Sequence, residues 1–262
     1  MPASLGCLRP LAVRQAQRDG CDPRTLRRIV SAMSPQEQQA DDVKIGTVDT
    51  AVVDVDGTLV DTNYHHTLAW ARAFARHELF PPAWRIHRAI GMGGDRLVAA
   101  VVGDDTEASV GDAVRAAWTE EFDPFLQEVG LLPGAAEFLA FLHGRELRVV
   151  LATSGKPEHV DHYLDLLNGR ELADTWVTAE DADASKPAPD LVQSAMRRVD
   201  ASAAVMVGDS IWDVHSAAQL GVPTVCVLSG GIAAGELREA GARAVYEDLP
   251  GLQRDWEHLT AP

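Results

Sequence analysis

The chain has 262 residues, of which 46% are hydrophobic, so it can bury the core of one large domain with an insertion or of two modest domains. Its formal net charge of -16 disfavours nucleic acid and anionic membranes as partners, because either one would require a basic surface. No apolar run approaches the roughly 18 to 20 residues of a membrane span, and Cys7, Cys21 and Cys226 form neither a disulfide framework nor a CxxC metal pair. We therefore expect a cytoplasmic protein without a signal peptide.

Residues 1–45 are expected to form a loosely ordered extension. They carry scattered Arg, Gln and Ser, without a sustained period apart from a possible short helix over Thr25–Met33. An Arg-rich start is also typical of a transit peptide, but Asp19 and Asp22 weaken that interpretation. A start codon assigned too far upstream is an equal alternative.

A buried strand is predicted after the extension, because Val48–Val55 is a β-branched run that turns at Asp56-Gly57. Helical periodicity then extends over three segments: Tyr64–Glu78, Leu97–Val102 and Asp112–Phe122. Residues 63–132 are therefore expected to be all-helical.

From residue 147 the chain alternates between strands and helices. The expected strands are Arg148–Ala152, Thr175–Thr178, Ala203–Val207, Thr224–Leu228 and Ala244-Val245. One helix is expected over Ala135–Leu142, and others begin near Pro157, Pro189, Asp213 and Ala234. This alternation predicts an α/β fold with a doubly wound parallel sheet. We expect residues 46–62 and 133–262 to form this core, with residues 63–132 inserted after the first strand.

The segment Asp54-Val55-Asp56-Gly57-Thr58 is the clearest chemical feature. Two carboxylates two residues apart at a strand end point in the same direction, and the glycine lets the backbone turn immediately afterwards. One carboxylate can attack a substrate while the other handles a proton. An ordinary Asp-Gly turn would give the same pattern.

Three further segments place polar residues after apolar strands: Thr153-Ser154-Gly155, Ser185-Lys186-Pro187, and Gly208-Asp209-Ser210 with Asp213. Singly, each has an ordinary explanation, since Thr153 and Asp213 can cap helices and a lysine is usually a solvated surface charge. The order of these segments along the chain is what favours a functional site over these ordinary explanations.

Over about residues 47–250 the chain resembles the haloacid dehalogenase superfamily, in the branch of phosphoglycolate phosphatases and β-phosphoglucomutases. Four motifs in order carry the resemblance: Asp54-Val55-Asp56-Gly57-Thr58-Leu59-Val60-Asp61-Thr62, Thr153 after Val149-Val150-Leu151-Ala152, Lys186 in Ser185-Lys186-Pro187-Ala188-Pro189-Asp190, and Gly208-Asp209-Ser210-Ile211-Trp212-Asp213. The resemblance implies that residues 63–132 are a small helical cap domain, which closes over the site and excludes water.

The same resemblance implies that Asp54 attacks phosphorus and that Asp56 protonates the leaving oxygen, then activates water. A carboxylate that attacks a phosphate meets strong repulsion, so Mg²⁺ held by Asp54, the carbonyl of Asp56 and Asp209 is expected to neutralise charge. Thr153 and Lys186 are expected to donate to the phosphoryl oxygens.

Asp213 is expected to orient Lys186 or a water molecule on the metal, and it completes the predicted metal site. The predicted substrate-binding residues are Thr58, Ser154, Gly155, His66, Arg88 and Gly93, the last two from a Gly-rich connection between cap helices.

The predicted activity is hydrolysis of a small phosphorylated metabolite by a monomer or homodimer. Asp56 disfavours dehalogenation and phosphonate cleavage, because true dehalogenases lack an acid at that position and phosphonate hydrolases usually do as well. A sugar-phosphate mutase is the alternative, since His66 and Trp70 follow the first motif at distances similar to those in mutases. Against it, Gly94 stands where mutases often carry a phosphate-binding Arg.

The fourth motif also has the Gly-Asp-Ser of phosphatases rather than the Glu-Asp pair of mutases. A catalytically silent binding protein is the least favoured alternative. Its expected signature is the loss of Asp54, Asp56, Lys186 or Asp209, and all four are present.

Overall fold

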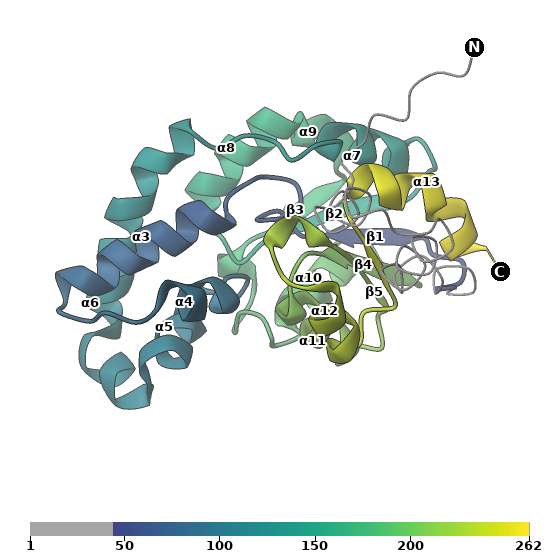
Figure 1. Cartoon of the computed structure of the whole chain (residues 1–262). Helices are drawn as coiled ribbons and strands as arrows, with labels where there is room; N and C mark the ends of the chain where they lie inside the picture. The colour runs from purple at the N-terminus through teal and green to yellow at the C-terminus, as the bar shows by residue number, and fades with distance from the viewer. Residues whose placement is uncertain (1–43, 262) are drawn as a thin grey trace, which may run out of the picture. The chain divides into compact units, whose positions relative to one another are not determined.

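The computed structural model of the protein describes residues 44–261 (Figure 1). The predicted extension lies outside the described residues except for its last two positions, and so does the possible helix over Thr25–Met33. Between residues 44 and 261, every helix is too short or too polar to cross a lipid bilayer.

Six parallel strands form one sheet in the order β3-β2-β1-β4-β5-β6. The strands are β1 (Thr50–Val53), β2 (Arg148–Ala152), β3 (Thr175–Val177), β4 (Ala204–Gly208), β5 (Thr224–Val227) and β6 (Ala244–Tyr246). Each strand pair is parallel, which confirms the predicted α/β fold class. Apolar runs suit these strands because helices cover both faces of the sheet.

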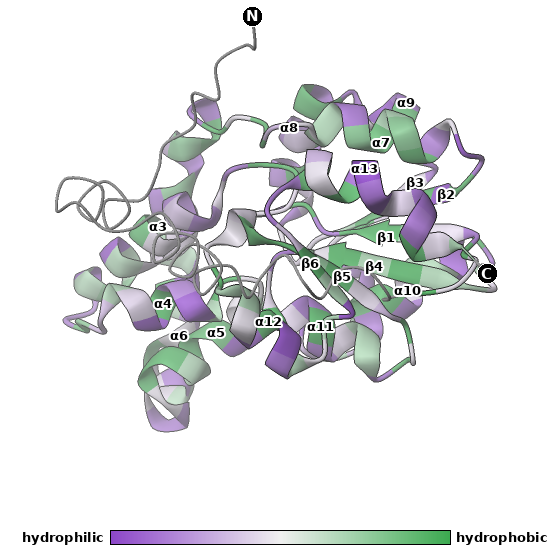
Figure 2. Ribbon diagram, turned by 45° about the vertical axis from the view of Figure 1, so that its right-hand side comes forward, coloured by the Kyte–Doolittle hydropathy of each residue, from purple (hydrophilic) through white to green (hydrophobic). Residues whose placement is uncertain are grey.

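Helices form a layer on each face of the sheet (Figure 1). One layer contains α7 (Ala135–His143), α8 (Pro157–Leu167), α9 (Gly169–Leu172) and α13 (Leu249–Thr260), and the other contains α10 (Asp190–Arg198), α11 (Ile211–Ala218) and α12 (Ala234–Ala240). Alternate residues of β1 face the two layers: Val53 belongs to the hydrophobic cluster that includes residues of α7 and α13, and Val52 belongs to the cluster that includes residues of α10. Figure 2 shows the sheet strands as predominantly hydrophobic between these layers.

A helical segment follows β1 and precedes α7. It consists of α3 (Asn63–Arg76), α4 (Ala83–Ala89), α5 (Gly94–Val102), α6 (Asp104–Phe122) and the 3-10 turn η1 (Asp123–Gln127). These helices have a hydrophobic cluster of their own, in which Phe74 and Ile86 are completely buried. The helices expected within residues 63–132 are thus present as far as Gln127, whereas residues 128–132 are not helical and Leu131 forms a bridge with Val60. The separation of this segment as a cap domain stays a prediction.

Three of the described helices, α4, the short α9 and α13, are absent from the sequence prediction. Helix α13 packs Leu252 and Trp256 into the core, and the side chain of Asp248 caps it by accepting a hydrogen bond of 2.7 Å from the amide of Gly251. The Pro250-Gly251 pair is typical of a turn, but proline in the first helical turn is compatible with a helix start. Helix α4 (Ala83–Ala89) occupies the first part of the predicted Gly-rich connection, residues 85–96.

Candidate active site

Three neighbouring strands bring the predicted motifs to one edge of the sheet. Asp54 follows β1, Thr153 follows β2 and Asp209 follows β4. Because β1 lies between β2 and β4 in a parallel sheet, the carboxyl ends of all three strands point toward the same place. Side chains from distant parts of the chain therefore meet at this edge.

Asp54 is buried at this edge, with 5% of its surface exposed. Its Oδ1 atom lies 2.5 Å from Nζ of Lys186, and its Oδ2 atom accepts a hydrogen bond of 3.2 Å from Thr58 Oγ1. Lys186 Nζ also lies 2.6 Å from Oδ1 of Asp213, so one ammonium group bridges two buried carboxylates. Burial lowers the pKa of Lys186, but these carboxylates raise it above its ordinary value, which keeps the lysine charged.

Asp209 lies beside this ion-paired cluster and accepts only neutral donors among the described residues. Thr58 Oγ1 lies 3.2 Å from its Oδ1 atom, and Asn63 Nδ2 donates to its Oδ2 atom at 2.8 Å. The backbone turns tightly here at Gly57, where φ is +79° and a Cβ atom would lie 2.4 Å from Asn63 Nδ2. Only glycine fits this position without displacing the amide that holds Asp209.

Asp56 has a different environment from the first carboxylate of the motif. Its Oδ1 atom accepts a hydrogen bond of 2.8 Å from Thr62 Oγ1 and lies 3.1 Å from Nε2 of His66. Its Oδ2 atom accepts a hydrogen bond of 2.8 Å from Thr153 Oγ1. Since His66 belongs to α3 and Thr153 follows β2, Asp56 joins the helical segment to the sheet.

These contacts shift the pKa values of the carboxyl groups in opposite directions. Burial raises the pKa of Asp54 well above its ordinary value, and neighbouring carboxylates add to this effect while Lys186 opposes it. Burial would also raise the pKa of Asp56, but the hydrogen bond and charge of His66, with the two threonine hydroxyls, lower it to about 2. Burial and a neighbouring carboxylate raise the pKa of Asp209 to about 7.

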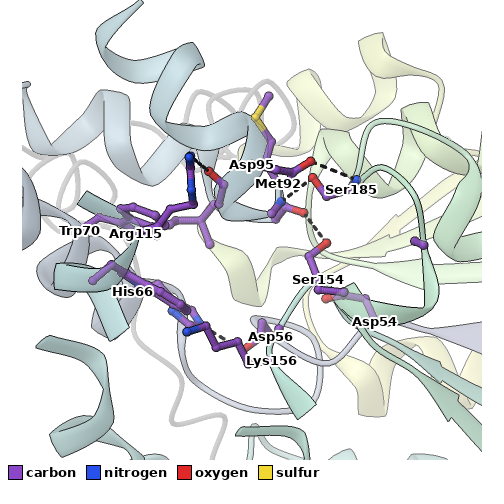
Figure 3. Close-up of a pocket in the computed structure, with 18 of the residues that line it drawn as sticks. Asp54, Asp56, His66, Trp70, Met92, Asp95, Arg115, Ser154, Lys156 and Ser185 are labelled. Atoms are coloured by element: carbon purple, nitrogen blue, oxygen red, sulfur yellow. Dashed lines mark hydrogen bonds and ion pairs between the residues drawn. The ribbon is translucent and has the colours of Figure 1, made fainter. Parts of the chain in front are cut away.

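A cavity of about 340 Å³ lies next to the carboxylates of Asp54 and Asp56. Asp54 and Asp56 line it from the sheet edge, whereas Trp70 and Met92 line it from the helical segment (Figure 3). Such a volume lies near the lower end of small-molecule sites. The site therefore fits a small ligand with a reactive group placed against the sheet edge.

Two core loops hold the helical segment over this cavity. The amide of Gly93 donates to Ser185 Oγ at 3.0 Å, and Ser154 Oγ donates to the carbonyl of Gly91 at 3.4 Å. Gly91 has φ of +99°, and a Cβ atom there would lie 2.8 Å from Ser210 Oγ. A glycine is thus required at this close approach of the helical segment to the core.

Residues 48–221 match the family model of the haloacid dehalogenase-like hydrolases. The chain belongs to this family. Phosphoglycolate phosphatase from Rhodospirillum rubrum is 33% identical over 225 residues, which cover 80% of this chain and 91% of that protein. Validoxylamine A 7'-phosphate phosphatase from Streptomyces hygroscopicus subsp. limoneus is 26% identical over 213 residues, which cover 80% of this chain and 97% of that protein.

A solved structure of a hydrolase from Pseudomonas syringae is similar to this haloacid dehalogenase-like hydrolase, with a TM-score of 0.75 and 30% identity. The similarity covers 81% of this chain and 99% of that one. The family and its phosphatase relatives identify the protein as a phosphatase, and they confirm the resemblance to the phosphoglycolate phosphatase branch.

The structure of this haloacid dehalogenase-like phosphatase brings most predicted site residues together. Those that line the cavity are Asp54, Asp56, His66, Gly93, Ser154 and Gly155. Five other predicted residues are not in the lining but belong to the same group of contacts. Thr58, Thr153 and Lys186 bond to carboxylates of the site, and Asp209 and Asp213 carry two of these carboxylates. Arg88 is outside the cavity lining, and its guanidinium lies 2.6 Å from Glu236, so the geometry gives no support to its predicted contact with substrate.

Several residues of the site were missed from the sequence, among them one that holds a buried carboxylate and one lysine of the cavity lining. Asn63 holds Asp209, and Lys156 lines the cavity. Their sequence signals are weak but present: Asn63 directly follows Thr62 of the first motif, and Lys156 directly follows Gly155 of the second. Neither signal identifies the partner, because each partner lies far away along the chain.

The buried carboxylates form a donor set suited to a hard divalent cation. Oxygen atoms of Asp54, Asp209 and Asp213 lie within 4.8 Å of one another. The ammonium group of Lys186 is paired with Asp54 and Asp213, so one positive charge stands against three carboxylates and the cluster can retain negative charge. Burial, together with the charge of Asp213, raises the pKa of Asp209. Carboxylate oxygens are the ligands that such cations prefer, and the residues present therefore fit a divalent metal ion.

Proposed function

We propose that the protein is a magnesium-dependent phosphatase that hydrolyses a small phosphate monoester through an aspartyl phosphate on Asp54. The observation that carries this proposal is the contrast between two carboxylates of one motif. Asp54 lies against buried Lys186, whereas Asp56 is held by hydrogen bonds that favour its charged form. Two carboxyl groups in such different environments suit the separate roles of nucleophile and proton carrier.

Asp54 is the nucleophile of the first half-reaction. Its carboxylate oxygen attacks phosphorus, the bond from phosphorus to the leaving oxygen breaks, and Asp56 protonates that oxygen. In the free protein the pKa of Asp56 is about 2, and the negative charge of a bound phosphate raises it toward the range where it can carry this proton. Lys186 keeps Asp54 in place and offsets the charge that gathers there.

Asp56 is the base of the second half-reaction. It removes a proton from water while the water oxygen attacks phosphorus, the bond between phosphorus and Asp54 breaks, and inorganic phosphate leaves. The hydrogen bonds from Thr62 and Thr153 favour the ionised form of Asp56, as a base requires. In this arrangement Thr153 orients Asp56, in addition to the predicted donation to phosphoryl oxygens.

Mg²⁺ held by Asp54, Asp209 and the carbonyl of Asp56 would neutralise phosphate charge and favour in-line attack. Asp213, at 2.6 Å from Lys186, is placed to hold that lysine. The helical segment would act as a cap that excludes water from the aspartyl phosphate. We propose further that the protein works in the cytoplasm, as a monomer or homodimer.

The test is steady-state release of inorganic phosphate from a panel of small phosphate esters with magnesium. Asp54→Asn is expected to lower kcat by at least about 10⁴-fold, because the amide cannot form the aspartyl phosphate. Activity should also disappear with EDTA and return when magnesium is added. Asp105→Asn, which changes an exposed carboxylate of α6, is the matched control and is expected to retain activity.

Phosphate release that persists in Asp54→Asn would contradict the proposed nucleophile. Interconversion of phosphosugar isomers that needs a bisphosphate activator, without net phosphate release, would show a mutase instead. Measuring both inorganic phosphate and the isomerised sugar phosphate distinguishes these outcomes.

A further inference from the structure

The 3-10 turn η3 (Leu228–Gly230), which follows β5, contacts the sheet edge closely. Ser229 Oγ donates to the carbonyl of Gly57 at 2.6 Å, so the turn is tied to the loop that follows β1. The backbone at Gly230 runs directly against the carboxylate cluster, because a Cβ atom there would overlap Oδ2 of Asp209. The position of this turn therefore limits the space available to Asp209.

The carbonyl of Gly230 accepts hydrogen bonds from two helices of the helical segment. Nδ2 of Asn63, in α3, donates to this carbonyl at 3.3 Å and to Oδ2 of Asp209 at 2.8 Å. Nε2 of His87, in α4, lies 3.0 Å from the same carbonyl and donates to it when it carries the ring proton. A carbonyl oxygen has two lone pairs, and these two donors occupy both. One backbone oxygen of the core thus joins α3 to α4.

The imidazole of His87 is supported from α3. The ring of Tyr64 stacks on it, with centroids 5.0 Å apart and an angle of 14° between the planes. Tyr64 directly follows Asn63, so the first turn of α3 supplies both the amide at Asp209 and the ring that holds His87. His87 is partly buried, and its ring is presented to the carbonyl of Gly230 by this packing.

Asn63 is the donor that Asp209 depends on most among the described residues. Thr58 has one hydroxyl proton and lies 3.2 Å from oxygens of both Asp54 and Asp209, so that proton is shared. The amide nitrogen of Asn63 has one N–H group for Asp209 and another for Gly230. Its amide oxygen is buried without a partner in this part of the chain. The amide group is therefore held through its nitrogen alone.

We propose that Asn63 and His87 are positioning residues, which hold Asp209 through the carbonyl of Gly230 and thereby raise the affinity of the carboxylate cluster for a divalent cation. This inference rests on the metal site of the proposed function and adds two residues that lie outside the cluster. Hydrogen bonds to a carboxylate ligand orient it before the metal ion binds, and their loss weakens metal binding. Docking of the helical segment and metal binding then favour each other.

The experiment measures the binding of Mn²⁺ to the metal-free protein in the absence of substrate. Mn²⁺ prefers the same oxygen ligands as Mg²⁺, and the EPR signal of the free ion reports how much remains unbound. Asn63→Ala is expected to raise Kd by about 10- to 100-fold, the usual effect of removing a partner of a metal ligand. His87→Ala is expected to raise Kd by about 3- to 10-fold, the range of one hydrogen bond.

A conservative variant and a matched control separate this connection from a general loosening. His87→Gln keeps a side-chain N–H donor and should recover most of the affinity. Arg88→Gln removes the contact of the same helix with Glu236, away from Gly230, and should leave Kd within about twofold of wild type. If Arg88→Gln weakens binding as much as His87→Ala, loosened docking is the cause and the proposal is overturned.

The double variant tests whether His87 acts through Asn63. If it does, His87→Ala should have little further effect on Kd when Asn63 is already alanine. Additive effects of the two substitutions on the binding free energy would contradict the proposed route through Gly230. Should Asn63→Ala fail to fold, the comparison of His87→Ala, His87→Gln and Arg88→Gln decides the question by itself.

The failure of this inference can be told from the failure of the proposed function. If His87→Ala binds Mn²⁺ as tightly as wild type, the role of His87 is overturned, while magnesium-dependent release of phosphate still supports the phosphatase. If the wild-type protein binds no Mn²⁺ and releases phosphate in the presence of EDTA, the proposed metal site fails and the inference fails with it.

Discussion

The two walls of the cavity are built in different ways. At the sheet edge, Asp54 and Asp56 are each held by charged or hydrogen-bonding side chains at 2.5 to 3.2 Å. The helical segment presents mainly rings and apolar chains, among them Trp70, Ile90 and Met92, with the charged Asp95 and Arg115 at the cavity as well. This difference indicates that the sheet edge fixes the chemistry, whereas the helical wall fixes the size and shape of what is admitted.

At the sheet edge, the pKa values of two neighbouring carboxyl groups are shifted in opposite directions. Burial raises the pKa of Asp54, and hydrogen bonds lower that of Asp56 to about 2. A backbone separation of two residues is thus enough to give two carboxyl groups distinct roles, provided that other elements supply their partners.

Among the substitutions that test this contrast between Asp54 and Asp56, Asp56→Asn should lower activity the most. We expect a loss of about 10² to 10⁴ in kcat on alkyl phosphates, because no group protonates the leaving oxygen or activates water. p-Nitrophenol is a good leaving group, so p-nitrophenyl phosphate should still phosphorylate Asp54 and give a burst of about one equivalent of product before turnover stalls. Rapid mixing at 405 nm measures the burst, and full steady turnover of this ester would contradict the assignment of the base.

Lys186→Met should weaken both activity and stability. The loss of a phosphoryl donor is expected to lower kcat by about 10² to 10³-fold. Removal of the buried ammonium also leaves Asp54 and Asp213 without compensation, which is expected to reduce the free energy of unfolding by about 3 to 5 kcal/mol.

Urea unfolding at pH 7 measures this loss, and Lys156→Met is the matched control, since its side chain is only partly buried. Equal unfolding free energies for the two lysine variants would refute the distinction between a structural cation at the sheet edge and a ligand-facing one.

Arg88→Gln should have the smallest effect. Its partner Glu236 is partly exposed, and exposed ion pairs contribute about 0 to 1 kcal/mol. We expect kcat/KM to change by less than about threefold, because Arg88 lies outside the cavity lining. A loss of tenfold or more, confined to KM, would restore the sequence prediction that Arg88 contacts the substrate.

Local sequence pattern predicted the parallel sheet and the positions of its chemical residues. The β-branched run before Asp54 forms β1, and polar residues after β2 and β4 come to the same edge because parallel strands share one direction. Helix α13 escaped prediction because a Pro-Gly pair stands near its start, although Leu252 and Trp256 have helical spacing.

The sequence by itself determined the fold class, the family and the set of carboxylates and lysine at the strand ends, because these depend on local periodicity and motif order. Only the tertiary structure decided that His66 bonds to Asp56, that Asn63 holds Asp209 and that Lys156 lines the cavity and donates to Thr119. These pairings depend on how the helical segment docks against the sheet, since the partners come from separate elements and spacing along the chain carries no information about their distance in space.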